Sequence, residues 1–252
     1  MCQAGVDSEN MQKRIQKFGL QGFTYQGCPA RFWDMTGGPG IPVRVTISDM
    51  GPVLLSRLLG LTQVQEGVLN IVFRIADDRQ MLLIDLKDLR AMLNYVSEHA
   101  KEYTTTYGNV SAQSVGAILR ALIAVEDQGG DIFFGEPSLE LSDWFSCDPM
   151  GRGYVNILNA ARIIQQPQIY SMFLLWMLSD LFEKLPEVGD LDKPRFVFFF
   201  DEAHLLFKDM PSELLNKLVQ VVKLIRSKGV GVYFITQSPS DIPGEVLAQL
   251  SN

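Results

Sequence analysis

Phe196-Val-Phe-Phe-Phe200, followed at once by Asp201-Glu202, is the stretch that decides the fold. Unbroken apolar character indicates a central strand of a parallel sheet, because both faces of such a strand are covered. Carboxylates directly after it lie at the edge where open α/β sheets bind ligands. In phosphoryl transfer to water, one acid can hold Mg²⁺ through its water shell and its neighbour can polarise the attacking water. We predict the metal role for Asp201 and the general-base role for Glu202; the alternative is that the pair only caps a loop.

A second strand is predicted at residues 230–236, after a helix at 212–227, and it ends in Gln237. The intervening helix brings the ends of both strands to one edge, so Gln237 is a candidate sensor that hydrogen-bonds the γ-phosphate or the attacking water. A structural bond within the loop is the alternative for this residue. Arg226 and Lys228 close the helix, where cations complement its dipole. That explanation is preferred for Lys228, whereas Arg226 is also a candidate to face phosphates of its own or a neighbouring subunit.

The pattern around these strands predicts an α/β fold. A strand at 154–158 and a helix at 167–185 precede the strand at 195–200, so strands and helices alternate regularly. Such alternation predicts a parallel sheet with right-handed crossovers and helices on both faces.

The remainder of the chain is organised around that core. Residues 1–40 are polar and glycine-rich, and we expect a connecting segment with at most one short helix, followed by a first strand at 42–47. Helical spacing from 52 to about 128 predicts about four helices, and residues 243–252 begin one more. The predicted domains are 1–50, the connecting segment and first strand of the core; 51–130, a helical insertion; and 131–252, the core portion with the site.

Composition limits the classes of function. The formal net charge of -7 argues against a surface that holds nucleic acid by phosphate neutralisation alone, so any contact with DNA must be local. The longest apolar run, 172–178, is too short to cross a bilayer and predicts a buried helix. Three separated cysteines without a C-x-x-C pair predict neither a disulfide framework nor a zinc site, and we expect a reducing cytoplasm: Cys2, Cys28 and Cys147.

One expected element is absent from residues 1–252. No Lys is followed by Ser or Thr, so the phosphate-binding loop G-x-x-x-x-G-K-[ST] does not occur. Gly37-Gly-Pro-Gly40 imitates such a loop, but its proline removes a backbone donor, and we expect a turn. Asp85 imitates a strand-end acid but is better explained as a helix cap. Either the loop precedes residue 1 in the natural protein or the chain is a degenerate relative.

Several segments together resemble the bacterial HerA-like ATPases of the YjgR type. The resemblance rests on Val197-Phe-Phe-Phe-Asp-Glu-Ala-His-Leu-Leu-Phe207, on residues 224–231 and 237–243, and on further matches that cover most of the chain. It implies a RecA-like P-loop core of the HerA and FtsK group, with a helical insertion, ATP and Mg²⁺ as cofactors, and a P-loop upstream of Met1. It also implies arginine-bearing segments downstream of Asn252 and a hexameric ring that moves DNA. Asp201 and Glu202 match the family's Walker B acids, and Gln237 matches its sensor position.

Three functions remain in competition. The first is ATP hydrolysis by a helicase or translocase-type ATPase, of which this chain is a fragment inactive alone. The second is a non-catalytic protein interaction module on a degenerate NTPase fold. The letters Asp201-Glu-Ala-His204 also invite comparison with DEAH-box helicases, but Thr236-Gln-Ser238 does not match their Ser-Ala-Thr motif, and we expect His204 to pack against or cap the loop.

Overall fold

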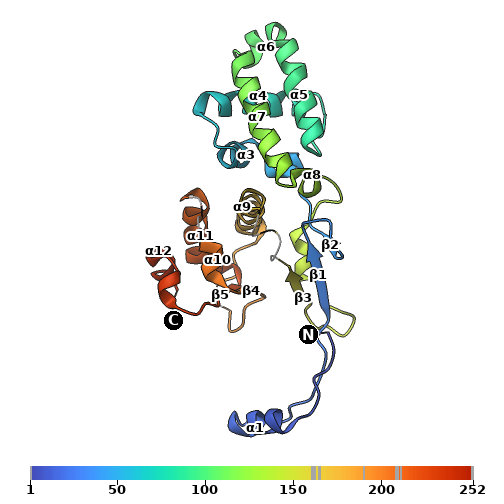
Figure 1. Cartoon of the computed structure of the whole chain (residues 1–252), viewed down its shortest axis with the longest axis vertical. Coiled ribbons are helices and arrows are strands. Elements are labelled where there is room, and N and C mark those ends of the chain that lie inside the picture. The colour runs from blue at the N-terminus through green and yellow to red at the C-terminus, as the bar shows by residue number, and fades with distance from the viewer. Residues whose placement is uncertain are drawn as a thin grey trace.

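A computed structural model describes residues 2–159, 163, 166–189, 191–207, 210 and 212–250. Three regions follow one another along the long axis of Figure 1. A block of helices lies at one end, the strands and their covering helices lie in the middle, and an arm that carries helix α1 (Glu9–Lys17) extends at the other end. The candidate site belongs to the middle region.

The strands form two small parallel sheets. In the first, β1 (Ala30–Asp34) lies between β2 (Ile41–Pro42) and β3 (Val155–Leu158). In the second, β4 (Phe196–Phe200) pairs with β5 (Val230–Phe234) in the register Phe200 to Phe234. Helices α9 (Pro167–Lys184) and α11 (Ser212–Leu224) pack against one another beside β4 and β5. The predicted α/β class with parallel strands is therefore confirmed, as are the strands at 154–158, 195–200 and 230–236.

The β4–β5 sheet is covered unequally on its two faces. Phe196, Phe198 and Phe200 face the hydrophobic core, where Phe198 lies 6.4 Å from the ring of Trp144. On the opposite face, Phe199 and Tyr233 stack at 5.0 Å and are 65% and 53% exposed. Helices were expected on both faces, but within the described residues they cover only one.

The helical block contains more helices than predicted. Residues 52–128, all of which the structure describes, form five helices in place of about four, because Gly108, with φ of 101°, and the junction at His99 set off a separate short helix, and a further short helix follows at residues 130–133. The predicted cap at Asp85 is confirmed, because its side chain accepts from two backbone amides; Ser111 likewise caps a helix by accepting from the amide of Ser114. The helices are α3 (Pro52–Leu58), α4 (Gln63–Asp78), α5 (Leu86–Glu98), α6 (Ala100–Tyr107), α7 (Ala112–Asp127) and α8 (Gly130–Phe133).

The first strand was predicted in the wrong place. β1 lies within the segment expected to be a connection, and its Trp33 is buried and donates to Asn156 on β3 at 2.9 Å. The predicted strand at 42–47 is confirmed only at Pro42, the last residue of β2, and at Val45, which forms an isolated bridge with Phe134. Its amides bond in turn to three different parts of the chain, Asp34, Phe133 and Ile84, so no continuous ladder forms. A short helix, α2 (Ile47–Met50), begins where the strand was expected to end.

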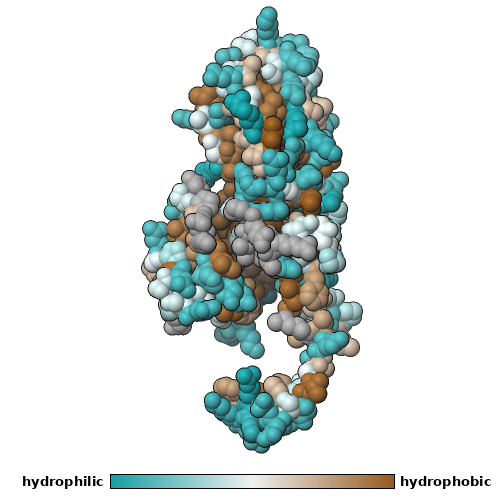
Figure 2. All heavy atoms as spheres, viewed as in Figure 1, coloured by the Kyte–Doolittle hydropathy of each residue, from teal (hydrophilic) through white to brown (hydrophobic). Residues whose placement is uncertain are grey.

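The arm preceding β1 comprises residues 2–29. Its helix α1 is capped by Ser8 and has no buried residue, and its tip is mainly hydrophilic in Figure 2. The two extended segments that lead to and from the helix lie side by side. A Cβ at Gly27 would stand 2.4 Å from the carbonyl oxygen of Cys2, so this close approach requires glycine. The one short helix expected in this region is therefore present.

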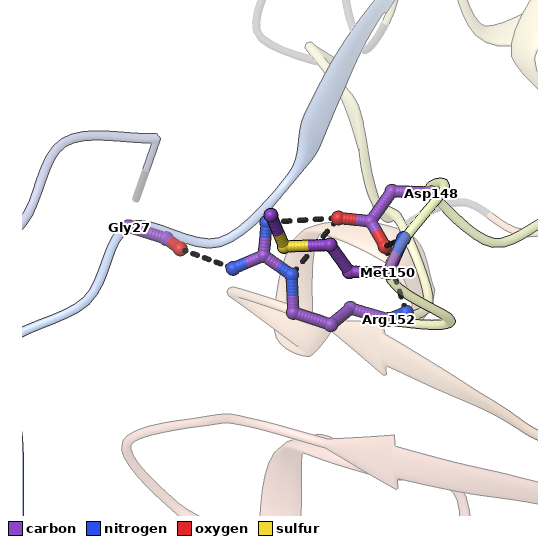
Figure 3. Close-up of polar contacts among 4 residues, drawn as sticks. All are labelled: Gly27, Asp148, Met150 and Arg152. Atoms are coloured by element: carbon purple, nitrogen blue, oxygen red, sulfur yellow. Dashed lines mark hydrogen bonds and ion pairs between the residues drawn. The ribbon is translucent and has the colours of Figure 1, made fainter.

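A loop before β3 is closed by one carboxylate. Asp148 accepts hydrogen bonds from the amides of Met150 at 3.0 Å and Arg152 at 2.8 Å, and its other oxygen accepts from the Arg152 guanidinium (Figure 3). Arg152 also donates to the carbonyl of Gly27 at 3.4 Å, which joins the loop to the chain entering β1. The backbone hydrogen bond from Arg152, followed by its side chain and the Met150 amide, lowers the pKa of Asp148.

The remaining short elements complete the middle region. Among the described helices, no single one is long and apolar enough to cross a membrane; α6 and α7 pass that test only as a pair bent by 100°. The predicted buried helix around residues 172–178 is confirmed, because all of those residues belong to α9 and their side chains are buried. Further elements are η1 (Leu141–Phe145), α10 (Ala203–Phe207), η3 (Ile225–Lys228), η4 (Pro239–Asp241) and α12 (Gly244–Leu247).

Candidate functional site

The turn from β4 into α10 carries both predicted acids. Asp201 and Glu202 follow β4 directly, and both are exposed. Asp201 folds back so that its Oδ1 accepts from the Glu202 amide at 3.0 Å. Glu202 has φ of 49°, in the left-handed region that a residue with a Cβ occupies at a penalty of about 1–2 kcal/mol. Backbone strain of this kind is concentrated at functional sites, so the strain at Glu202 favours a functional role for this turn.

Pairing with β5 holds the turn in place. The amide of Ile235 donates to Phe200 at 2.9 Å, and the amide of Ala203 donates to Ile235 at 2.9 Å. These two bonds bracket the acids and set them beside the chain that leaves β5. Gln237, two residues beyond Ile235, is exposed at the same edge. The structure thus brings Asp201, Glu202 and Gln237 to one edge of the sheet; their chemical roles remain predictions.

The loop after β5 is organised by local side-chain bonds. Thr236 donates to Asp241 at 2.9 Å, and Ser238 caps η4 by accepting from the Ser240 amide. Ile242 is buried at the end of this loop. Gln237 therefore lies between two residues whose side chains are hydrogen-bonded within the loop, which suits a side chain that must keep a fixed position.

Arg226 does not join the other three residues. It is exposed on η3, before β5 begins, whereas Gln237 follows the end of β5. Five strand residues separate the two ends, which at about 3.3 Å per residue amounts to roughly 16 Å. Within one subunit, Arg226 thus lies at the opposite end of the strand from the acids. A role toward the phosphates of a neighbouring subunit remains a prediction.

Lys228 has a different role from the one predicted. The residue is only 9% exposed, and its ammonium donates to the carbonyl of Leu185 at 2.6 Å, so it caps the C-terminus of α9 instead of the helix that precedes it in sequence. Glu187 lies 3.3 Å away, and the ring of Phe182 lies 5.1 Å from the ammonium. Sequence spacing does not show this contact, because Leu185 is 43 residues away.

His204 lies closer to the acids than the sequence indicated. Its Nδ1 is 3.3 Å from Oε2 of Glu202. Sequence reasoning assigned His204 to packing or capping, and the only signal for the contact was its position two residues after Glu202. The left-handed backbone at Glu202 brings the two side chains together.

The donor set at this edge fits Mg²⁺ that arrives with a nucleotide. Mg²⁺ binds proteins through one or two carboxylates and completes its octahedron with water and phosphate oxygens. Among the described residues there is no group of three or more His, Cys, Asp or Glu side chains placed to hold a metal ion. Two hollows, of about 270 and 340 Å³, lie in the helical block and not at the acids. The two acids therefore lie at an open edge of the sheet.

Comparison with known proteins identifies the family. Residues 1–252 match the helicase HerA-like C-terminal family, and the chain belongs to it. The predicted resemblance to HerA-like proteins is confirmed at this level. A comparison with curated protein sequences gave no match.

Solved structures of one protein are also similar. The plasmid coupling protein TrwB with the non-hydrolysable GTP analogue GDPNP is 16% identical, with a TM-score of 0.48. TrwB with ADP and Mg²⁺ is 14% identical, with a TM-score of 0.49. Each comparison covers 86% of this chain and 57% of that chain. This chain thus spans less than two thirds of the TrwB chains that it matches.

Proposed function

We propose that this chain carries the metal-holding and water-activating half of an ATPase site in a HerA-like helicase or translocase. The observation that supports this most directly is the turn after β4, where Asp201 and Glu202 lie beside the exit of β5. A P-loop that does not occur in residues 1–252 would supply the grip on the triphosphate. ATP and Mg²⁺ are the proposed cofactors, and the isolated chain is proposed to be inactive.

The proposed roles follow from the positions of the three side chains. Asp201 would bind the water shell of Mg²⁺; when bound, the ion neutralises charge on the phosphate oxygens. Glu202 would accept the proton of the attacking water, because its carboxylate is exposed at the same edge. Gln237 would donate a hydrogen bond to the γ-phosphate or orient the water from the neighbouring strand.

The exposed face of the β4–β5 sheet supports the proposal that a further element packs against it. Parallel strands are ordinarily covered on both faces, yet Phe199, Tyr233 and Ile235 are 65%, 53% and 48% exposed on one side. A strand and helix that carry the P-loop would cover this face and meet the acids at its edge. This placement would assemble both halves of the site in one core.

Phosphate release from ATP tests the proposal. In the full-length natural protein, Glu202→Gln should abolish hydrolysis in the presence of Mg²⁺ while nucleotide binding is kept, because the amide cannot accept the proton. Glu245→Gln, which neutralises an exposed acid on α12, is the matched control and should leave the rate unchanged. Unchanged phosphate release by Glu202→Gln would exclude Glu202 as the base, whereas a wild-type protein that releases no phosphate would favour an interaction module on a degenerate NTPase fold.

The isolated chain offers a second test. Calorimetry of residues 1–252 with a non-hydrolysable ATP analogue should register little binding, because the backbone amides and lysine of a P-loop supply most of the grip on phosphates. Binding of low-micromolar affinity would contradict the proposed division of the site.

Assembly and location complete the proposal. A homo-oligomeric ring, hexameric as implied by the family resemblance, would bring Arg226 toward the nucleotide of a neighbouring subunit. Within one subunit, Arg226 lies too far from the acids to reach a nucleotide bound there. DNA is the substrate implied by the same resemblance, although the net charge of -7 adds no support for it. We place the protein in the cytoplasm. Light scattering of the full-length protein with and without ATP would test the ring.

A further inference from the structure

The Glu202–His204 pair has a geometry that packing alone does not explain. His204 Nδ1 lies 3.3 Å from Glu202 Oε2, with side chains 36% and 52% exposed. The Nδ1 atom itself is buried, and among the described residues it has no partner that meets hydrogen-bond geometry. A buried ring nitrogen left without a partner is unfavourable by about 1–3 kcal/mol, so a hydrogen bond from this atom to a nearby acceptor would stabilise the turn. That acceptor is the carboxylate proposed as general base.

Backbone hydrogen bonds fix the position of the Glu202 main chain but not the position of its carboxylate. The carbonyl of Glu202 accepts from Leu205 at 2.8 Å, and the next residue is tied to β5 through the bond from Ala203 to Ile235. Three rotatable bonds still separate the backbone from the carboxylate. A half-exposed base of this length needs a side-chain partner to hold it in one position, because a shift of about 1 Å at a reacting group lowers rates by about 100-fold.

We infer that His204 is a positioning residue for Glu202. In this role the Nδ1–H, which lies 3.3 Å from Oε2, donates to that oxygen once the two side chains align, so that the carboxylate is held and Oε1 is left to accept the proton of the attacking water. The inference rests on the proposed function for the role of Glu202, but the contact itself is a property of residues 1–252. It requires the imidazole tautomer that carries its proton on Nδ1, which the partner of that nitrogen selects.

The tautomer of His204 tests the contact without any ATPase activity. The sequence has two histidines, and His99 Nδ1 lies 2.8 Å from the carbonyl of Tyr95, so His99 is an internal reference for the Nδ1–H form. Long-range proton–nitrogen NMR spectra of the ¹⁵N-labelled 252-residue chain at alkaline pH should show His204 in that same form. Glu202→Ala should move His204 toward the Nε2–H form and leave His99 unchanged. A wild-type His204 in the Nε2–H form, or no response to Glu202→Ala, would overturn the inference.

Two isosteric variants test the role in the full-length protein. The amide nitrogen of asparagine can replace Nδ1, whereas that of glutamine replaces Nε2. His204→Gln and His204→Ala should lower kcat on the order of 10- to 100-fold with KM for ATP within about 2-fold, because only the positioning of the base is lost. His204→Asn should retain most of the wild-type kcat. Equal losses in Asn and Ala variants with unchanged melting temperatures would contradict the donor role of Nδ1.

A double substitution tests whether His204 acts through Glu202, and the NMR result separates this inference from the proposed function. Because His204 acts through Glu202, His204→Ala should lower kcat in the wild-type background but leave the residual rate of Glu202→Gln unchanged. A wild-type protein that hydrolyses no ATP would refute the proposed function, and the NMR result would then still decide whether His204 holds Glu202. His99→Ala, in the helical block, is the control and should keep the wild-type kcat.

Discussion

Replacement of Lys228 by Met tests how the ends of α9 and β5 are held together. The Lys228 ammonium is buried, donates to the carbonyl of Leu185 at 2.6 Å and lies 5.1 Å from the ring of Phe182. Glu187 approaches it at 3.3 Å, and hydrogen bonding from Ser227, with Lys228 as a further contributor, lowers the pKa of Glu187. Met keeps the apolar stem of the side chain and removes only the charge and its contacts.

The expected loss is about 1–3 kcal/mol of unfolding free energy. A hydrogen bond from a charged donor contributes about 1.5–3 kcal/mol, and the contact with Phe182 adds about 0.5–2 kcal/mol. Against these, Met removes the unfavourable burial of an ammonium group, which can offset several kcal/mol. A net loss is expected because the carbonyl of Leu185 is left without its donor. Glu187 is mainly exposed, so its separation from Lys228 contributes little.

Urea unfolding of the two proteins measures the effect. Lys228→Met should lower the midpoint with an unchanged m-value, since the surface exposed on unfolding is nearly the same. Lys223→Met, an exposed lysine on α11, is the matched control and should change the unfolding free energy by less than about 0.5 kcal/mol. A Lys228→Met protein as stable as the wild type, or more stable, would refute this explanation of the buried lysine.

Three further predictions test other parts of the structure. Phe198→Ala should lower the unfolding free energy by about 2–4 kcal/mol and Phe199→Ala by less than about 1 kcal/mol, because only the first ring faces the core; equal losses in urea titrations would argue against the unequal faces of the sheet. Gly229→Ala should destabilise by about 1–2 kcal/mol, because φ is 75° and a Cβ would meet side chains at 3.1 Å; a thermal midpoint at the wild-type value would count against it. Asp148→Asn should remove a pH-dependent part of stability. Since the pKa of Asp148 is lowered on folding, that part is present above the ordinary value of 3.8 and is lost as pH falls below it, so the wild-type advantage should shrink on acidification; a constant difference between pH 7 and pH 3 would contradict this.

The sequence pattern correctly predicted the elements whose formation depends on neighbouring residues in the chain. Apolar runs identified β4 and α9, and a side-chain cap identified the start of the helix at Asp85. The prediction failed where long-range pairing decides. Residues 42–47 alternate like a strand and bury alternate side chains, but their amides bond to three separate partners. Residues 30–34 look irregular in sequence, yet β2 and β3 on either side make them the central strand of a sheet.

The same distinction applies to the site. Order along the chain sufficed to place Asp201, Glu202 and Gln237 at one edge, because parallel neighbours joined by a helix end on the same side. It did not place Arg226, whose distance from that edge depends on the length of β5, or Lys228, whose partner is remote in sequence. The contact of His204 with Glu202 depends on a left-handed backbone at a residue with a side chain, which sequence patterns do not indicate.

The nucleotide retained by Glu202→Gln tests the central claim most directly. The full-length variant would be incubated with ATP and Mg²⁺, separated from free nucleotide by rapid gel filtration, and its bound nucleotide identified by chromatography. If Glu202 activates water while Asp201 and the phosphate grip are intact, the variant should retain ATP and the wild type should retain ADP. Bound ADP on the variant in the amount found on the wild type would contradict the account.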